Sequence, residues 1–165
     1  MPCPCKSGKG YRQCDDGKLG ECVCQVAGRR QPPPANPAIR PSGDPLQAPP
    51  NVAAAPPRAN RTASGLAYLM LAPGTGTTHP SPTSRVTVHY TGWTTDGKMF
   101  DSSRKRGRKA TFPLNRLIAG WTEGLQLMVV GAHYRFWIPE RLAYKGSPNK
   151  PQGVLVFDIE LFAIQ

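Results

Sequence analysis

The residues with the clearest potential for chemistry lie between Arg85 and Leu161. They form five segments in this order: VTVHYTG, DGKMFDSS, IAGWTEGLQLMVVG, FWIPERLAY and VLVFDIEL. Together these segments indicate an aromatic pocket, and they hold no pattern typical of a nucleophile or a metal site. Such a pocket favours a reaction that rotates a bond over one that breaks a bond, and a proline ring suits it.

Rotation about a peptide bond is slow because the resonance of the amide must be lost. The barrier is about 18–20 kcal/mol, and an uncatalysed prolyl bond isomerises in roughly tens to hundreds of seconds. A twisted imide is less charge-separated than a planar one, so an aromatic box favours the transition state over the ground state. This kind of catalysis needs no covalent step and no cofactor.

Strands of alternating hydrophobicity must position these segments. In four stretches every second residue is apolar or aromatic, which predicts these shared faces: Leu66, Tyr68 and Met70; Val86, Val88 and Tyr90; Tyr134, Phe136 and Ile138; and Leu155, Phe157, Ile159, Leu161 and Ala163. The opposite faces carry residues such as His89, Asp158 and Glu160. We therefore expect half-buried antiparallel strands, with His89 on a solvated side.

Residues 118–128 lack this alternation and predict a helix. Four apolar residues recur there at helical spacing: Ile118, Trp121, Leu125 and Met128. Gly131 follows as a stop signal, and Asp96-Gly97 predicts a turn before Met99. One short helix against a curved antiparallel sheet is an α+β layer arrangement.

In the order and spacing of the five segments, residues 64–165 resemble the FKBP-type peptidyl-prolyl cis-trans isomerases, a family that also binds macrolide immunosuppressants. The resemblance implies a curved antiparallel β-sheet half-wrapped around one short α-helix, with the pocket between sheet and helix. It also implies a cofactor-free enzyme that accelerates rotation of X-Pro bonds in unfolded or flexible proteins and so assists folding.

The resemblance implies an aromatic role for four residues: Trp121 as the floor of the pocket, and Tyr90, Phe100 and Phe157 as its walls. Many family members have a further aromatic residue between the FDSS segment and the helix. This chain has Ala110 there, so Phe112 is the nearest candidate. Without the motif order, such residues would more often be ordinary core residues.

The resemblance also implies a set of polar contacts around the pocket. Asp101 would be the polar group at the mouth, ordered by Arg106. The backbone N–H of Ile118, preceded by Leu117, would donate a hydrogen bond to a substrate carbonyl. The Tyr144 hydroxyl would donate to a substrate amide oxygen.

The loop after Tyr144, residues 145–153, departs from the family's pattern. It is shorter than the common form and lacks the aliphatic residues that overhang the pocket. Two functions therefore stay open: a catalytic isomerase, and a non-catalytic proline-binding or chaperone-like module of the same fold. The presence of Asp101, Trp121 and Tyr144 favours the catalyst.

The charge of the chain favours no specific partner. Its net charge of +11 is spread almost evenly along the sequence, and a diffuse positive balance attracts any polyanion weakly. The basic run at residues 104–109 is best explained as a solvated loop, with docking to an acidic client or a polyanion as the alternative. Nucleic-acid binding is disfavoured because the run lacks interleaved aromatic residues.

No apolar run is long enough to span a bilayer, and the first residues do not resemble a secretory signal. From the sequence as given we therefore expect a cytoplasmic location, with an exported, cell-envelope location as the alternative. That alternative follows from the first 27 residues, which look like short Cys-rich repeats of exported bacterial proteins.

Those 27 residues contain all the cysteines in a C-x-C-x8-C-x7-C-x-C array: Cys3, Cys5, Cys14, Cys22 and Cys24. The first half resembles a small zinc motif at the tail of the bacterial secretion ATPase. There the fourth ligand would be Asp15, Cys22 or Cys24. A structural zinc ion and a set of disulfides are both compatible with this array.

Residues 28–63 are rich in proline and have almost no large apolar side chains. Such a segment buries too little apolar surface to offset its ordering entropy, so we expect a disordered, semi-rigid tether. The predicted organisation is therefore a Cys-rich segment at 1–27, a linker at 28–63 and an isomerase domain at 64–165.

Overall fold

The structure is a computed structural model that describes residues 43–165. The predicted zinc or disulfide module at 1–27 lies outside the described residues, as does the first part of the predicted linker. Among the residues that are described, none of the helices is long and apolar enough to cross a membrane.

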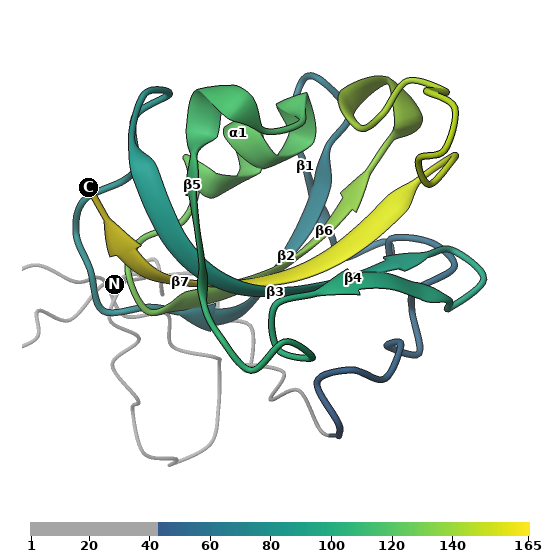
Figure 1. The fold of residues 1–165 in the computed structure, drawn as a ribbon, viewed down its shortest axis with the longest axis horizontal. Coiled ribbons are helices and arrows are strands. Elements are labelled where there is room, and N and C mark those ends of the chain that lie inside the picture. Colours follow the sequence, from purple (N-terminus) through teal and green to yellow (C-terminus); the bar gives the residue numbers. More distant parts are fainter. Residues whose placement is uncertain (1–42) are drawn as a thin grey trace, which may run out of the picture. The chain divides into compact units, whose positions relative to one another are not determined.

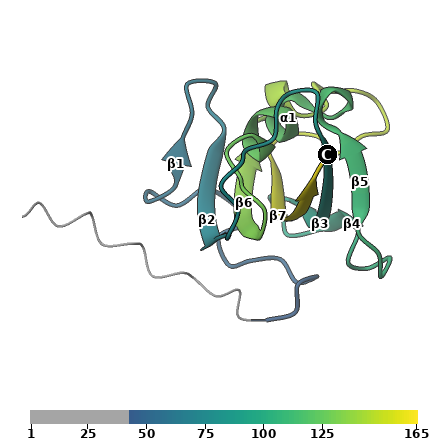
Figure 2. The ribbon, with the colours of Figure 1, turned by 90° about the vertical axis from the view of Figure 1, so that its left-hand side faces the viewer.

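A seven-stranded antiparallel sheet forms the body of residues 43–165, in the order β1-β2-β6-β7-β3-β4, with β5 also paired to β3. The strands are β1 (Asn60–Arg61), β2 (Ala67–Pro73), β3 (Arg85–Thr94), β4 (Met99–Ser102), β5 (Ala110–Pro113), β6 (Ala132–Ile138) and β7 (Leu155–Ile164). Figure 2 shows these strands side by side in the same order. The predicted curved antiparallel sheet is confirmed.

The helix α1 (Ala119–Leu125) lies across the concave side of this sheet (Figure 1). It is shorter than the predicted 118–128, because the chain leaves the helix after Leu125 through single turns and reaches Gly131 with φ 84°. The helix approaches the sheet closely. A Cβ atom at Gly120 would clash with Cγ2 of Ile138, so a larger residue there would require Ile138 or the helix to shift.

Two 3-10 turns complete the described elements, η1 (Leu114–Arg116) just before α1 and η2 (Glu140–Leu142) after β6. The turn between β3 and β4 lies at Asp96-Gly97 as expected, with Gly97 at φ 85°.

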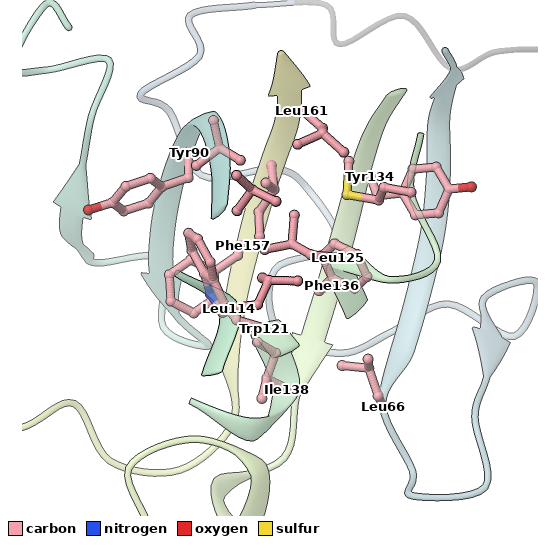
Figure 3. Packing of buried hydrophobic residues seen from close by; sticks show 14 of the residues in the cluster. Leu66, Tyr90, Leu114, Trp121, Leu125, Tyr134, Phe136, Ile138, Phe157 and Leu161 are labelled. Carbon is pink, nitrogen blue, oxygen red and sulfur yellow. The ribbon is translucent and has the colours of Figure 1, made fainter. Parts of the chain in front are cut away.

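The main hydrophobic core fills the space between α1 and the concave face. Its buried side chains come from every central strand and from α1 (Figure 3). The alternation predicted for β3, β6 and β7 is present, since Val88, Tyr134 and Ile159 are all buried on this face. This core holds the floor of the site.

The convex face of the sheet is also covered, which differs from the expected solvated face. A second hydrophobic cluster lies there: Ala67, Leu69, Leu71, Trp93, Trp137 and Val156. On β2 the better-buried set is therefore Ala67, Leu69 and Leu71, whereas Met70 of the predicted set is 45% exposed.

Residues 44–59, here called the strap, provide this cover. Ala48, Val52, Ala55 and Ala59 pack against the second cluster. The indole N–H groups of Trp93 and Trp137 donate hydrogen bonds to the carbonyls of Leu46 (3.2 Å) and Asn51 (3.1 Å).

The strap continues into β1, which pairs with β2 through Asn60 opposite Tyr68. The expectation of a disordered, semi-rigid tether is therefore wrong for residues 43–63, which pack against the sheet and pair with it. The small apolar side chains of the strap cover Trp93 and Trp137, and two of its backbone carbonyls accept the indole hydrogen bonds.

A buried ion pair lies between the sheet and the strap. Arg135 on β6 donates from Nε to Oδ1 of Asp158 on β7 (2.6 Å) and from Nη2 to Oδ2 (2.7 Å). Its remaining Nη1 donates to the side-chain oxygen of Asn51 in the strap (2.9 Å). The pair thus joins β6, β7 and the strap through one guanidinium group.

Candidate active site

A cavity of about 230 Å³ opens between α1 and strands β3, β4 and β7. It is lined by Tyr90, Phe100, Asp101, Phe112, Arg116, Leu117, Ile118, Trp121, Tyr144 and Phe157. Of the residues predicted for the isomerase site, Arg106 alone does not line the cavity, but it contacts two residues that do. The structure thus brings together side chains from β3, β4, β5, β7, η1 and α1, from the segment between η1 and α1, and from the loop after η2.

Trp121 lies at the centre of the aromatic part of the cavity. Its ring meets Tyr90, Phe157 and Phe112 edge to face, with centroids 5.1, 5.3 and 6.0 Å away. Figure 3 shows Trp121 beside Phe157, and Tyr90 with its hydroxyl directed away from the core. Edge-to-face packing on three sides fixes the plane of the indole ring.

Gly92 on β3 makes room for two walls of the cavity and was missed by sequence reasoning. It pairs with Phe157 across the sheet. A Cβ atom there would lie 2.6 Å from Cε1 of Phe157 and 2.8 Å from Cζ of Phe100. The T-shaped contact of Phe100 with Phe157, at 5.4 Å between centroids, depends on this space.

A closed triangle of polar side chains lies at the edge of the cavity. The Tyr90 hydroxyl donates to Oδ2 of Asp101 (2.6 Å), and Arg106 donates to Oδ1 of Asp101 and to the Tyr90 oxygen (2.8 Å). The backbone of Tyr90 is held by Ser103, whose Oγ accepts from the Tyr90 N–H (2.8 Å). Asp101 is thereby fixed from two sides.

These contacts set the ionisation of the site. Burial alone would raise the pKa of Asp101, but the hydrogen bonds from Tyr90 and Arg106 and the charge of Arg106 outweigh it, so this pKa lies below its ordinary value. Burial and the hydrogen bond to Asp101 raise the pKa of Tyr90. Burial and the Asp101 charge raise the pKa of Tyr144. At neutral pH the site therefore holds one carboxylate and two neutral phenols.

Ile118 is the N-cap of α1. Its carbonyl accepts hydrogen bonds from the N–H groups of Trp121 (3.0 Å) and Thr122 (3.1 Å). Its own N–H donates no hydrogen bond within residues 43–165, as is usual at the start of a helix. Since Ile118 lines the cavity, this donor is available to a ligand carbonyl.

The loop after Tyr144 is organised by short contacts. Ser147 donates from Oγ to the Tyr144 carbonyl (2.6 Å), and Nζ of Lys150 lies 5.4 Å from the centre of the Tyr144 ring.

Arg116 at the end of η1 is the lining residue that the sequence motifs did not single out. Its position directly before Leu117 was the available signal.

The cavity contains no metal-binding cluster. Across the described range 43–165, no three His, Cys, Asp or Glu side chains gather as they would around a metal ion. His89 pairs with Ser103 at 3.0 Å and meets Phe162 edge to face, so it contacts neighbours on its strand face rather than the cavity.

A family model described as FKBP-type peptidyl-prolyl cis-trans isomerase matches residues 76–162. The chain belongs to this family. The match spans the strands and the helix that build the cavity, so the FKBP fold accounts for the position of the aromatic side chains.

Individual members of the FKBP family are also similar. The FKBP-type isomerase FkpA of Aeromonas hydrophila is 54% identical over 107 residues, which cover 63% of this chain and 40% of that protein. The FKBP-type 22 kDa isomerase of Escherichia coli is 46% identical over 109 residues, or 64% of this chain and 52% of that one. The chain thus spans about half or less of the length of these relatives.

A solved structure, that of FkpA from Escherichia coli, has the same fold. It matches with a TM-score of 0.62 and 37% identity, over 67% of this chain and 53% of that one.

Proposed function

We propose that this FKBP domain catalyses cis-trans rotation of X-Pro bonds in protein substrates. The observation that carries the proposal is the cavity itself: a three-sided aromatic enclosure on Trp121, with the Ile118 N–H and the Tyr144 hydroxyl at its lining. The family membership and the named activity of the relatives support the same reaction.

Catalysis would follow from differential binding. The proline ring enters the aromatic enclosure, where the planar imide loses water that stabilises its charge-separated form. The twisted imide loses less on this transfer, so the barrier falls relative to that in water. No residue of the cavity needs to exchange a proton or form a bond with the substrate.

The polar groups would orient the peptide rather than react with it. The Ile118 N–H donates to one substrate carbonyl and the neutral Tyr144 hydroxyl to another. Asp101, held by Tyr90 and Arg106, keeps a fixed negative group at the mouth. Holding both sides of the X-Pro bond allows rotation about that bond alone.

A non-catalytic proline-binding module is the second candidate. The observation that favours it is the short loop 145–153, because none of its residues lines the cavity. A macrolide is a further ligand that the same cavity would bind through its aromatic floor and the Ile118 N–H. Titration with such a compound, followed by competition with an X-Pro peptide, tests this.

The function is tested by measuring cis-to-trans isomerisation of a short X-Pro peptide with the wild-type chain and with Trp121→Ala and Asp101→Ala variants. Removing the Trp121 ring takes away apolar contact that is worth roughly 1.5–3 kcal/mol, so kcat/KM should fall about tenfold or more. Phe162→Ala is the matched control, because Phe162 lies on β7 outside the cavity.

Circular dichroism of each variant verifies folding before rates are compared. Acceleration that falls in Trp121→Ala and is kept in Phe162→Ala supports the isomerase. A folded wild-type chain that binds the peptide without accelerating it would establish the binding module instead.

For the cysteine segment, zinc and disulfides stay alternative proposals. A native mass spectrum separates them, because a zinc ion adds mass that a chelator removes, whereas each disulfide removes two hydrogens.

A further inference from the structure

The cavity carries a positive side chain that the proposed reaction does not use. Arg116 is exposed, lines the cavity beside Leu117 and Phe112, and forms no ion pair within residues 43–165. A second cation, Lys150, lies over the ring of Tyr144 on another lining side chain. Arg116 is therefore placed beside a substrate that occupies the aromatic enclosure, whereas Lys150 contacts Tyr144 without lining the cavity itself.

No carboxylate of the cavity neutralises Arg116. Asp101 is the acidic residue in the lining, and its two oxygens are already bound by Arg106 and Tyr90. The acids of β7 lie outside the cavity lining and are also paired, Asp158 with Arg135 and Glu160 with Arg104. The mouth thus keeps an excess of positive charge.

A groove of about 760 Å³ lies next to the cavity, and Leu117 and Ile118 line both. This groove is electrically mixed, because it contains Lys145 and also Glu123, which accepts a hydrogen bond from Ser64. The preference for a negatively charged substrate residue should therefore be strongest next to the proline, where Arg116 lies, and weaker for residues bound further along the groove.

We propose that the cavity selects X-Pro segments with a carboxylate side chain directly beside the proline, and that Arg116 recognises this carboxylate. A guanidinium group matches a carboxylate through two parallel hydrogen bonds. The inference rests on the proposed function, since it concerns the substrate of the same cavity.

The expected effect is modest because Arg116 is exposed. An exposed ion pair changes an equilibrium by about one- to fivefold. We expect about a threefold preference for Glu over Gln beside the proline, and a similar discrimination against Lys. Reversing the charge at Arg116 should change the Glu-to-Gln ratio by about tenfold.

The test uses the full chain and six peptides of one length, with Glu, Gln or Lys placed directly before or directly after a single proline. A protease-free isomerisation assay gives kcat/KM for each peptide, and calorimetry gives each Kd. Wild type, Arg116→Glu and Arg108→Glu are compared. Arg108 provides the matched control, since it is an exposed cation of the loop 104–109 that does not line the cavity.

The proposal is supported if Glu peptides lead in at least one of the two positions, if Arg116→Glu reverses the order, and if Arg108→Glu preserves it. The preference should also weaken in high salt. Equal values for all six peptides, or a preference that survives in Arg116→Glu, would overturn it.

The failure of catalysis is a separate result. If no peptide is accelerated, the proposed function falls, but the Kd values still decide the inference: a Glu preference that Arg116→Glu reverses supports charge selection by a binding module. Equal Kd values in that case would overturn both.

Discussion

The Tyr90 hydroxyl on β3 donates a 2.6 Å hydrogen bond to Oδ2 of Asp101 on β4. Arg106 donates to both members of this pair, so the three side chains hold one another in place. The carboxylate at the mouth is thereby kept ionised and oriented without a substrate. Loss of any one member leaves the other two with a vacant hydrogen-bonding position.

The lowered pKa of Asp101 predicts the acid limit of activity. Because the pKa of Asp101 is lower in the folded protein than in the unfolded chain, the ionised carboxylate stabilises the folded protein above the unfolded pKa. This stabilisation is lost as the pH falls through the folded pKa. We therefore expect kcat/KM to persist below the ordinary aspartate range. Arg106→Ala should raise the pKa of Asp101 and move the acid limb to higher pH. A pH profile of kcat/KM, with an NMR titration of Asp101, measures both.

Arg108→Ala is the control for the pH profile, because it removes the same charge from the same loop without touching Asp101. An acid limb that stays in place when Arg106 is removed would show that another group sets it.

Gly92→Ala should distort the walls of the cavity while the protein still folds. The new methyl group would press on Phe157 and Phe100, and flexible rotation of these rings can relieve the clash only by changing the cavity walls. We expect a loss of about 1–3 kcal/mol in unfolding free energy and a clear rise in the Kd for an X-Pro peptide. Urea unfolding and calorimetry measure these. Unchanged peptide affinity would show that the walls adapt.

The ion pairs of β7 should differ in their effect on stability. The Arg135–Asp158 side chains are 10% and 14% exposed, whereas those of Arg104–Glu160 are 29% and 31% exposed. Asp158→Ala leaves the buried Arg135 guanidinium without its carboxylate and should lower the unfolding free energy by about 3–5 kcal/mol. Glu160→Ala, two residues away, should cost about 0–1 kcal/mol. Urea unfolding of both variants tests this, and equal losses would contradict the role of burial.

The strap should contribute to the stability of the sheet. Val52→Asp places a charge against the second hydrophobic cluster and should lower the unfolding free energy by about 1–3 kcal/mol. The loss cannot exceed the free energy of detaching the strap, because a detached strap exposes the charge to water. Val154→Asp is the matched control, since Val154 is 39% exposed. Hydrogen exchange should show lost protection along β2 in Val52→Asp. Equal stability of the two variants would mean that the strap adds nothing.

The arrangement of the sheet and helix could be predicted because the information was local. Alternation along residues 86–90, 134–138 and 155–161 requires one buried face. The helical spacing of Trp121 and Leu125 requires a single short helix. The end of that helix could not be fixed in this way, because Met128 keeps the apolar spacing although it lies beyond the last helical residue.

The strap could not be predicted because its stabilisation comes from its partners. Ala48, Val52 and Ala55 are small, and nothing in the Pro-rich sequence shows that Trp93 and Trp137 need a cover. The outer face of β2 gave the one hint, since Leu69 and Leu71 alternate with the set that was assigned to the core.

The site was predictable to the extent that the motifs carry it. The aromatic lining residues other than Phe112 were named from five ordered segments. Gly92 was not, because its role depends on the distances to two rings, which no sequence pattern reveals. Arg116 was not either, although its position directly before Leu117 was an available signal.

The strap also divides the three tryptophans of the chain between two environments. Trp93 and Trp137 are buried beneath it, while Trp121 lies in the cavity on the other side of the sheet. The protein therefore contains two separate fluorescent reporters. A chain that keeps Trp121 alone would signal occupancy of the cavity, and a chain that keeps the other two would signal release of the strap.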